Sequence, residues 1–103
     1  MDIKKLLGKR IQEIRKSKKL TQEQVAEIIE MEPASLSNIE NGKYYPTAEN
    51  LEKILAVLEI KPSELFVFEH LAPKEELLTE MTASMQDNDK LTRLMYKFFQ
   101  LVK

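Results

Sequence analysis

Apolar residues recur at three- and four-residue intervals along the chain, and helix-capping signals divide this pattern into short segments. The first segment carries Ile3, Leu7, Ile11 and Ile14 on one face and should end near Lys18. No two stretches alternate apolar and polar residues in the way that a pair of strands requires. The spacing therefore predicts an all-α protein built from short amphipathic helices.

The second and third predicted helices follow each other closely. The stretch from Thr21 to Gln24 has the pattern of a capping box, in which the two end side chains serve free backbone amides at the start of a helix. A third helix should begin at Pro33, because its fixed φ and missing amide hydrogen suit the first helical position. It should end just before Gly42, which can take the left-handed conformation of a C-terminal cap. The buried stripe of the second helix is expected to be Val25, Ile28 and Ile29.

Two further helices complete a predicted five-helix unit over residues 1–68. Thr47 is expected to cap the fourth helix, and a short fifth helix should run from Pro62 to about Phe66. The inward residues of the fourth helix are expected to be Leu51, Ile54, Leu55 and Leu58. A chain of 103 residues has room for one such small core and an accessory segment.

Residues 69–103 differ in character and are predicted to form two amphipathic helices, the first of them opened by Pro73. Their apolar positions expose more surface than an isolated helix pair can leave in water. We expect this accessory segment to form a homodimer interface; folding back onto the first unit, or binding another protein, would also cover it. The interface residues would be Leu77, Met81, Met85, Leu91, Leu94, Met95, Phe98, Leu101 and Val102.

The net charge of −1 hides an uneven distribution of charged residues. Residues 1–20 carry eight Lys or Arg and two acidic residues, a net charge of +6, and the remaining residues sum to −7. A cationic segment on an otherwise acidic chain suggests one face that meets a polyanion such as nucleic acid. We expect a diffuse positive field, rather than defined contacts, from Lys9, Arg10, Lys16, Lys18 and Lys19.

The residue inventory argues against several classes of protein. With no cysteine, one histidine and no glycine-rich phosphate loop, we expect neither an enzyme nor a metal or cofactor site. The longest apolar run, Ile54 to Leu58, is too short to cross a membrane. These features predict a cytoplasmic protein, which would be associated with the nucleoid when it is bound to DNA.

The run from Leu20 to Lys43, followed by Pro46, closely resembles the Cro and phage-repressor-like helix-turn-helix family, also called the Xre family. The resemblance covers about residues 3–66. It implies a five-helix, lambda-repressor-like DNA-binding domain, with double-stranded DNA as its partner. The helix at about 33–41 would then be the recognition helix that enters the major groove.

Physical arguments explain the residue type at three positions of this motif and predict strain at a fourth. Ala26 must be small because the second and third helices cross tightly beneath it. Leu36 and Ile39 anchor the third helix in the core, which leaves its small and polar residues on another face. Glu30 departs from the pattern, because the family often has glycine at this turn position and a glutamate would be strained in a left-handed conformation.

The resemblance also implies which residues would read bases. The third helix offers no Arg, Lys or Gln, so the bidentate contact to guanine is not available from it. Asn38 could pair with adenine, and apolar atoms at the start of the helix could meet a thymine methyl group. We therefore expect a site that leans toward A and T, aided by DNA shape. The candidate base-reading residues are Pro33, Ala34, Ser35, Ser37 and Asn38.

Phosphate contacts are expected from both ends of the motif. Gln22 opens the second helix, where free amides and the positive end of the helix dipole suit a phosphate. Asn41 and Lys43 follow the recognition helix. Tyr44 and Tyr45 occupy a loop where the family often carries basic residues; their hydroxyls could donate to phosphate, or one ring could pack on the fourth helix.

Arg15 and Glu40 look functional but have a structural explanation. The family resemblance pairs an arginine and a glutamate at these positions, across the first and third helices. A paired Glu40 would be neutralised, whereas an unpaired one near DNA would repel phosphate. Direct contact of Arg15 with phosphate is the alternative.

These features together predict a bacterial or phage transcriptional regulator, most often a repressor in this family. It would act as a homodimer on a palindromic operator whose half-sites lie about 10 base pairs, or a multiple of that, apart. The alternative is the antitoxin of a toxin-antitoxin pair, which binds its own operator and uses its C-terminal helices to cover a toxin protein. A protein-interaction module without DNA binding is a third possibility.

Overall fold

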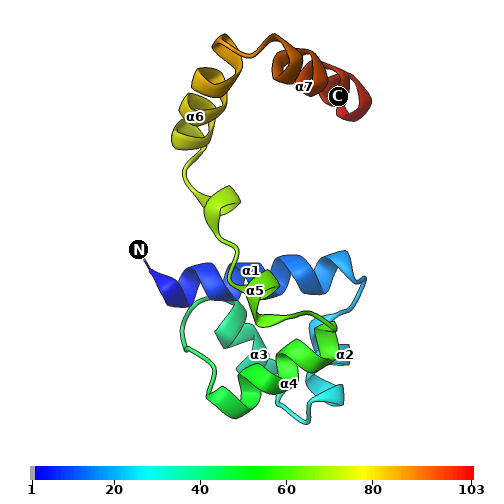
Figure 1. Cartoon of the computed structure of the whole chain (residues 1–103). Coiled ribbons are helices and arrows are strands. Elements are labelled where there is room, and N and C mark those ends of the chain that lie inside the picture. The colour runs from blue at the N-terminus through cyan, green and yellow to red at the C-terminus, as the bar shows by residue number, and fades with distance from the viewer. Residues whose placement is uncertain (1) are drawn as a thin grey trace. The chain divides into compact units, whose positions relative to one another are not determined.

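The computed structural model describes residues 2–103, in which every regular element is a helix (Figure 1). The predicted all-α class is confirmed, with five α-helices in the first part of the chain and two in the second. The elements are α1 (Ile3–Ser17), α2 (Gln22–Ile28), α3 (Pro33–Glu40), α4 (Ala48–Leu58), α5 (Pro62–Leu65), the 3-10 turn η1 (Glu69–Leu71), α6 (Lys74–Gln86) and α7 (Asp89–Val102). Two compact units divide the chain, one ending at Glu69 and one running from His70 to Lys103.

The capping residues begin the helices where the sequence places them. Thr21 and Gln24 form the predicted capping box: Gln24 N donates to Thr21 Oγ1 at 3.1 Å, and Thr21 N donates to Gln24 Oε1 at 2.8 Å. Thr47 Oγ1 accepts from the backbone amide of Asn50 at 3.1 Å. Pro33 occupies the first turn of α3. Each side-chain cap of this kind stabilises its helix by about 1 kcal/mol.

Four helices of the first unit end in the same hydrogen-bond arrangement, the Schellman motif. After α2, for example, Met31 N donates to Ala26 O at 2.8 Å, and Glu30 N donates to Glu27 O at 3.3 Å. A residue with positive φ closes each motif: Lys19 (60°), Glu30 (56°), Glu59 (55°) and Gly42 (77°). Only the last is a glycine, so three of the four turns hold an L side chain in the left-handed region, as expected at Glu30.

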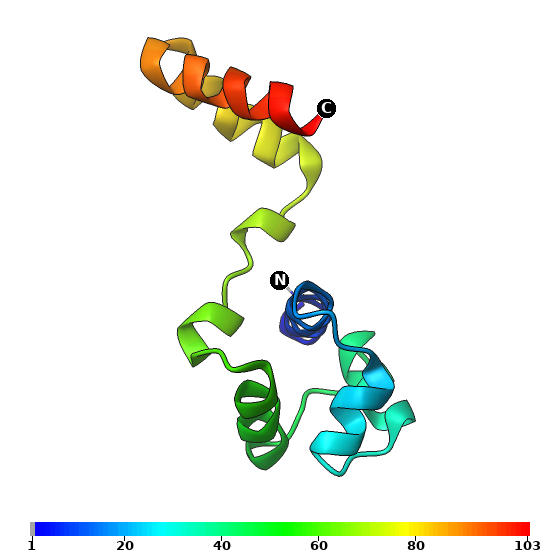
Figure 2. The same cartoon turned by 90° about the vertical axis from the view of Figure 1, so that its right-hand side faces the viewer.

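The core of the first unit lies between two pairs of helices. Figure 2 views α1 nearly along its axis, with α2 and α3 on one side and α4 and α5 on the other. Leu7, Leu36, Ile54 and Leu65 are all fully buried here, and they come from four different helices. The other buried hydrophobic residues are Ile11, Ile14, Val25, Ala26, Ile29, Ile39 and Leu58.

Two residues assigned to buried faces are instead exposed. Ile28 is 62 % exposed and Ile3 is 41 % exposed. Around the axis of α2, Ala26 lies about 100° from Val25, and these two residues define the buried face of the helix. Ile28 lies about 110° from the centre of that face. The prediction for Ile28 was wrong because a small residue takes the inward position.

Gly8 allows α1 to pass very close to the end of α3. A Cβ atom on this residue would lie 2.3 Å from Ile39 O and 2.6 Å from Glu40 O, which is too close for any real side chain. The role of this glycine is not predictable from nearby residues, because the backbone it approaches, at Ile39 and Glu40, is about thirty residues away in the chain. The close crossing positions α3 against the unit.

The second unit is a hairpin of α6 and α7 that buries none of its residues. Asn88 caps α7 by accepting from Leu91 N at 2.9 Å, and the hydroxyl of Thr92 donates to Met85 O at 2.7 Å. These bonds hold the turn between the two helices. Leu77, Met85, Leu91 and Met95 are half-buried, whereas the other proposed interface residues are exposed.

Candidate nucleic-acid interface

The face of α3 that carries the candidate base-reading residues lies at the surface of the first unit. Pro33, Ala34 and Ser35 are exposed, and Ser37 and Asn38 are half-buried. The helix is held from its other side by Leu36 and Ile39, which are 0 % and 5 % exposed. This arrangement leaves a face of small and polar side chains that offers little steric bulk to a groove.

Only short hydrogen-bonding groups are available on this face. On this face Asn41 Nδ2 donates to Ser37 Oγ at 3.4 Å, from one turn further along. Asn38 presents a carboxamide, whose donor and acceptor match the N7 and N6 atoms of adenine. No cationic side chain extends from Pro33–Glu40.

Arg15 and Glu40 form a buried ion pair that joins α1 to the last turn of α3. Arg15 Nε lies 2.7 Å from Glu40 Oε2, and Nη2 donates to Oε1 at 2.9 Å, a bidentate geometry. The two residues are 6 % and 5 % exposed. The hydrogen bond to Glu40 raises the pKa of the Arg15 guanidinium, although burial alone would lower it. Arg15 therefore stays charged, and it faces the protein interior rather than a phosphate.

Two further residues complete this polar cluster. The third guanidinium nitrogen, Arg15 Nη1, donates to Leu20 O at 2.8 Å, next to the start of α2. Gln22 Nε2 donates to Glu40 Oε1 at 2.9 Å. One carboxylate thus ties α1, α2 and α3 together, and no buried side-chain nitrogen or oxygen in residues 2–103 lacks a partner. The sequence predicts a phosphate contact for Gln22, and no local signal links this residue to Glu40.

The exit loop after α3 presents exposed side chains. Lys43 is exposed, and Tyr44 and Tyr45 are 61 % and 46 % exposed. Pro46 is the loop residue that is buried. Neither tyrosine ring is therefore part of the core, which leaves both side chains at the surface together with Lys43 and Asn41.

Arg10 has a defined structural role, contrary to the expectation of a diffuse field. Its Nε and Nη2 atoms donate to Glu64 O at 3.1 and 2.9 Å, and Nη1 pairs with Glu13. This guanidinium joins α1 to α5, because the carbonyl it binds lies in that short helix. The lysines expected to supply the field, which are Lys9, Lys16, Lys18 and Lys19, are all exposed.

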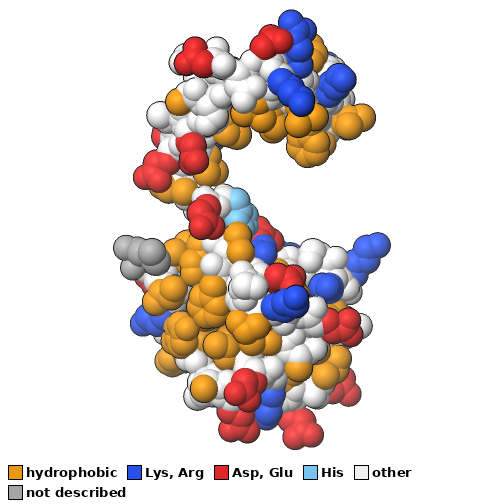
Figure 3. All heavy atoms as spheres, in the orientation of Figure 1, with side chains coloured by type: hydrophobic (Ala, Val, Ile, Leu, Met, Phe, Trp, Pro, Cys, Tyr) orange, Lys and Arg blue, Asp and Glu red, His pale blue; other side chains and the backbone are white. Residues whose placement is uncertain are grey.

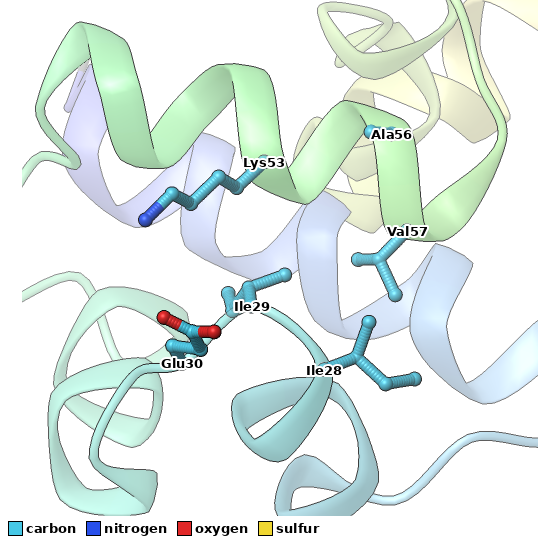
Figure 4. Close-up of a pocket in the computed structure, with 6 residues that line it drawn as sticks. All are labelled: Ile28, Ile29, Glu30, Lys53, Ala56 and Val57. Atoms are coloured by element: carbon cyan, nitrogen blue, oxygen red, sulfur yellow. The ribbon is translucent and has the colours of Figure 1, made fainter.

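A shallow apolar depression lies between the end of α2 and α4 (Figure 4). It has a volume of about 440 Å³, and the side chains of Ile28 and Val57 point toward each other across it. The remaining lining residues are Ile29, Glu30, Lys53 and Ala56. One glutamate and one lysine on an apolar wall do not form a catalytic constellation.

No group of three or more histidine and carboxylate side chains in the part of the chain that the structure describes could hold a metal ion. No helix in residues 2–103 combines the length and the apolar character needed to span a bilayer.

The sequence matches a family model described as helix-turn-helix over residues 11–65. The chain is 37 % identical over 70 residues to the immunity repressor protein of Bacillus phage phi105; the match covers 68 % of this chain and 49 % of the repressor. The chain thus spans about half the length of that relative. It is 46 % identical over 66 residues to the control protein C.MunI of Mycoplasma sp, covering 63 % of this chain and 89 % of that protein.

A solved structure extends the similarity into the second unit. The SinR protein/SinI protein complex contains a chain that is 26 % identical to this one, with a TM-score of 0.58. The match covers 94 % of this chain and 99 % of that chain. Neither named relative is an enzyme by its description, in agreement with the residue inventory.

Proposed function

This chain belongs to the helix-turn-helix family of DNA-binding transcriptional regulators, and from that premise we propose that it binds a palindromic operator as a homodimer, with α3 of each copy in the major groove. The observation that carries the proposal is the exposed, small and polar face of α3. Leu36 and Ile39 hold this helix on the core from the opposite side. An exposed helix face with only small and polar side chains fits a groove of the duplex.

The proposed DNA contacts divide into base readout and backbone positioning. Pro33, Ala34, Ser35, Ser37 and Asn38 would face base edges. Gln22, Asn41, Lys43, Tyr44 and Tyr45 would face phosphates. In this arrangement Gln22 uses one amide hydrogen for Glu40, and its second amide hydrogen serves a phosphate oxygen.

The homodimer is supported by the hairpin of α6 and α7. None of its residues is buried within the chain, and Leu94, Phe98 and Leu101 are 61 %, 57 % and 82 % exposed. Apolar surface of this extent is typical of an interaction site. A two-fold dimer would also present two recognition helices, and one such helix alone buries too little surface for tight specific binding.

Selection of bound sequences from a random DNA pool tests the proposal. We expect inverted half-sites, rich in A and T, whose centres lie about 10 base pairs or a multiple of that apart. Glu52→Ala, an exposed change on α4 away from the proposed contacts, serves as the matched control for variants of α3. A pool in which no sequence is enriched, from a folded protein, would contradict specific binding.

In a second candidate function, the hairpin of α6 and α7 binds a different protein. The neighbour that covers 94 % of this chain is described as a complex of two different proteins, SinR and SinI. A toxin protein would be such a partner in the antitoxin alternative. A molar mass measurement separates the candidates, because the homodimer forms from purified chain alone and a heterologous complex does not.

A further inference from the structure

The two helices of the hairpin carry opposite net charges. α6 contains one lysine and three glutamates, a net charge of −2. α7 contains one aspartate, two lysines and one arginine, a net charge of +2. The arrangement of a second copy against both helices therefore decides whether opposite or like charges meet.

Some of these charged residues lie next to the apolar residues of their own helix instead of on the opposite side. At about 100° per residue, Glu80 lies beside Leu77 and Glu75 lies beside Leu78 on α6, whereas Glu76 lies on the far side from the apolar positions. On α7, Lys90 and Lys97 are two turns apart, beside Leu94. Charges in such flanking positions select partner and orientation when helices pair.

The flanking charges are not used within the hairpin. On α7, Arg93 Nε pairs with Asp89 Oδ2 at 2.9 Å, on the outer side of the helix. Among the residues that the structure describes, Glu75, Glu80, Lys90 and Lys97 make no ion pair.

The hairpin is also open. In Figure 1 α6 and α7 diverge from their turn, and Figure 3 shows hydrophobic side chains gathered where the two helices face into this opening. On α6, Leu78 and Met81 are 47 % and 43 % exposed, and on α7 Phe98 is 57 % exposed. Each helix thus has apolar surface that its own hairpin partner does not cover.

We propose that two copies pair through these hairpins so that α7 of one copy packs against α6 of the other. This inference rests on the proposed homodimer and specifies its arrangement. Two-fold symmetry makes the contact twice, so each acidic helix meets a basic one at both places. The other arrangement, α6 against α6, would put two helices of charge −2 together, and like charges across an interface disfavour that pairing.

Cross-linking tests the arrangement directly, because the chain contains no cysteine. Chains carrying one introduced cysteine on α6, at Leu78→Cys or Met81→Cys, are mixed with differently tagged chains carrying Leu94→Cys, Phe98→Cys or Leu101→Cys on α7. Oxidation joins only residues whose Cα atoms approach within about 7 Å. We expect disulfides between the two kinds of chain in the mixture, and none when an α6 variant is oxidised alone.

Charge neutralisation gives an independent readout in the full chain. The double variant Glu75→Gln/Glu80→Gln should weaken the dimer about tenfold, since several exposed ion pairs of a few tenths of a kcal/mol each are lost. Higher salt should weaken the wild-type dimer in the same direction. Glu76→Gln, on the far side of α6, is the matched control and should leave the dissociation constant unchanged. Tighter association of the double variant would overturn the inference.

The outcomes separate the inference from the proposed function. A dimer that cross-links α6 to α6 overturns the helix arrangement and leaves the homodimer standing. A chain that is monomeric at micromolar concentration, with and without DNA, overturns both. DNA binding by that monomer would still support the role of α3.

Discussion

Glu40 Oε1 accepts a hydrogen bond from Gln22 Nε2 at 2.9 Å, while the same carboxylate forms a bidentate ion pair inside the unit. The first turn of α2 is thereby fixed to the last turn of α3. A residue that we propose as a phosphate ligand is thus oriented by the same carboxylate that holds the proposed recognition helix. Stability and DNA binding should respond together when this cluster is altered.

Arg15→Met should destabilise the protein by about 3 to 5 kcal/mol, because it leaves the buried carboxylate of Glu40 without its cation. Urea denaturation followed by circular dichroism measures the effect. The double variant Arg15→Met/Glu40→Leu removes both charges and should recover much of the loss. A single variant as stable as wild type would show that the pair contributes little to folding.

Gln22→Ala should weaken DNA binding by about 1.5 kcal/mol with all sequences alike, because a hydrogen bond to a charged phosphate is lost. Fluorescence anisotropy with selected and random duplexes measures both affinities. Loss of affinity for the selected site alone would contradict a backbone contact, and would assign base readout to this residue.

Asn38→Ala and Lys43→Ala should have different effects on binding. Loss of the Asn38 amide should reduce discrimination at one base position by about 1 to 3 kcal/mol. Loss of Lys43 should weaken binding to every duplex and reduce the salt slope by about 0.9. Titrations at several salt concentrations with matched and mismatched sites distinguish the two. Identical behaviour of the variants would refute the division of roles.

Gly8→Ala should destabilise the protein by about 1 to 3 kcal/mol, because the new methyl group would overlap the carbonyl oxygen of Ile39. Glu52→Ala, on an exposed helix surface, is the control and should change the urea midpoint little. A urea midpoint of Gly8→Ala equal to that of this control would show that α1 and α3 are further apart than in the structure.

Glu30→Gly should stabilise the first unit by about 1 kcal/mol, since Glu30 has φ of 56° and glycine takes this conformation without strain. Thermal denaturation measures the change. Glu27→Gly, within α2, is the opposite control and should destabilise the helix by a similar amount. A loss of stability in Glu30→Gly would show that the turn is not strained.

Local signals in the sequence predicted the helices well. The capping box at Thr21, the cap at Thr47 and the proline at the start of α3 act over three or four residues, so neighbours in the chain contain the whole signal. The glycine at position 42 and the left-handed turn at Glu30 belong to the same class. Family resemblance then supplied the arrangement of these helices.

Contacts between distant residues were not predictable in the same way. Arg10 binds a carbonyl 54 residues away, and Gln22 binds a carboxylate 18 residues away. Nothing near either residue specifies these partners. The error at Ile28 has a different cause: the buried stripe is assigned from the spacing of large apolar residues, although the family motif already places Ala26 at the helix crossing.

The affinity of Ala34→Glu for the selected operator tests the central claim most directly. Ala34 is exposed on α3, so the change should leave the fold intact, as circular dichroism can verify. If this face of α3 lies in the major groove, a negative charge there should reduce the affinity about a hundredfold or more. An Ala34→Glu protein that is folded and binds the operator as tightly as wild type would contradict the account.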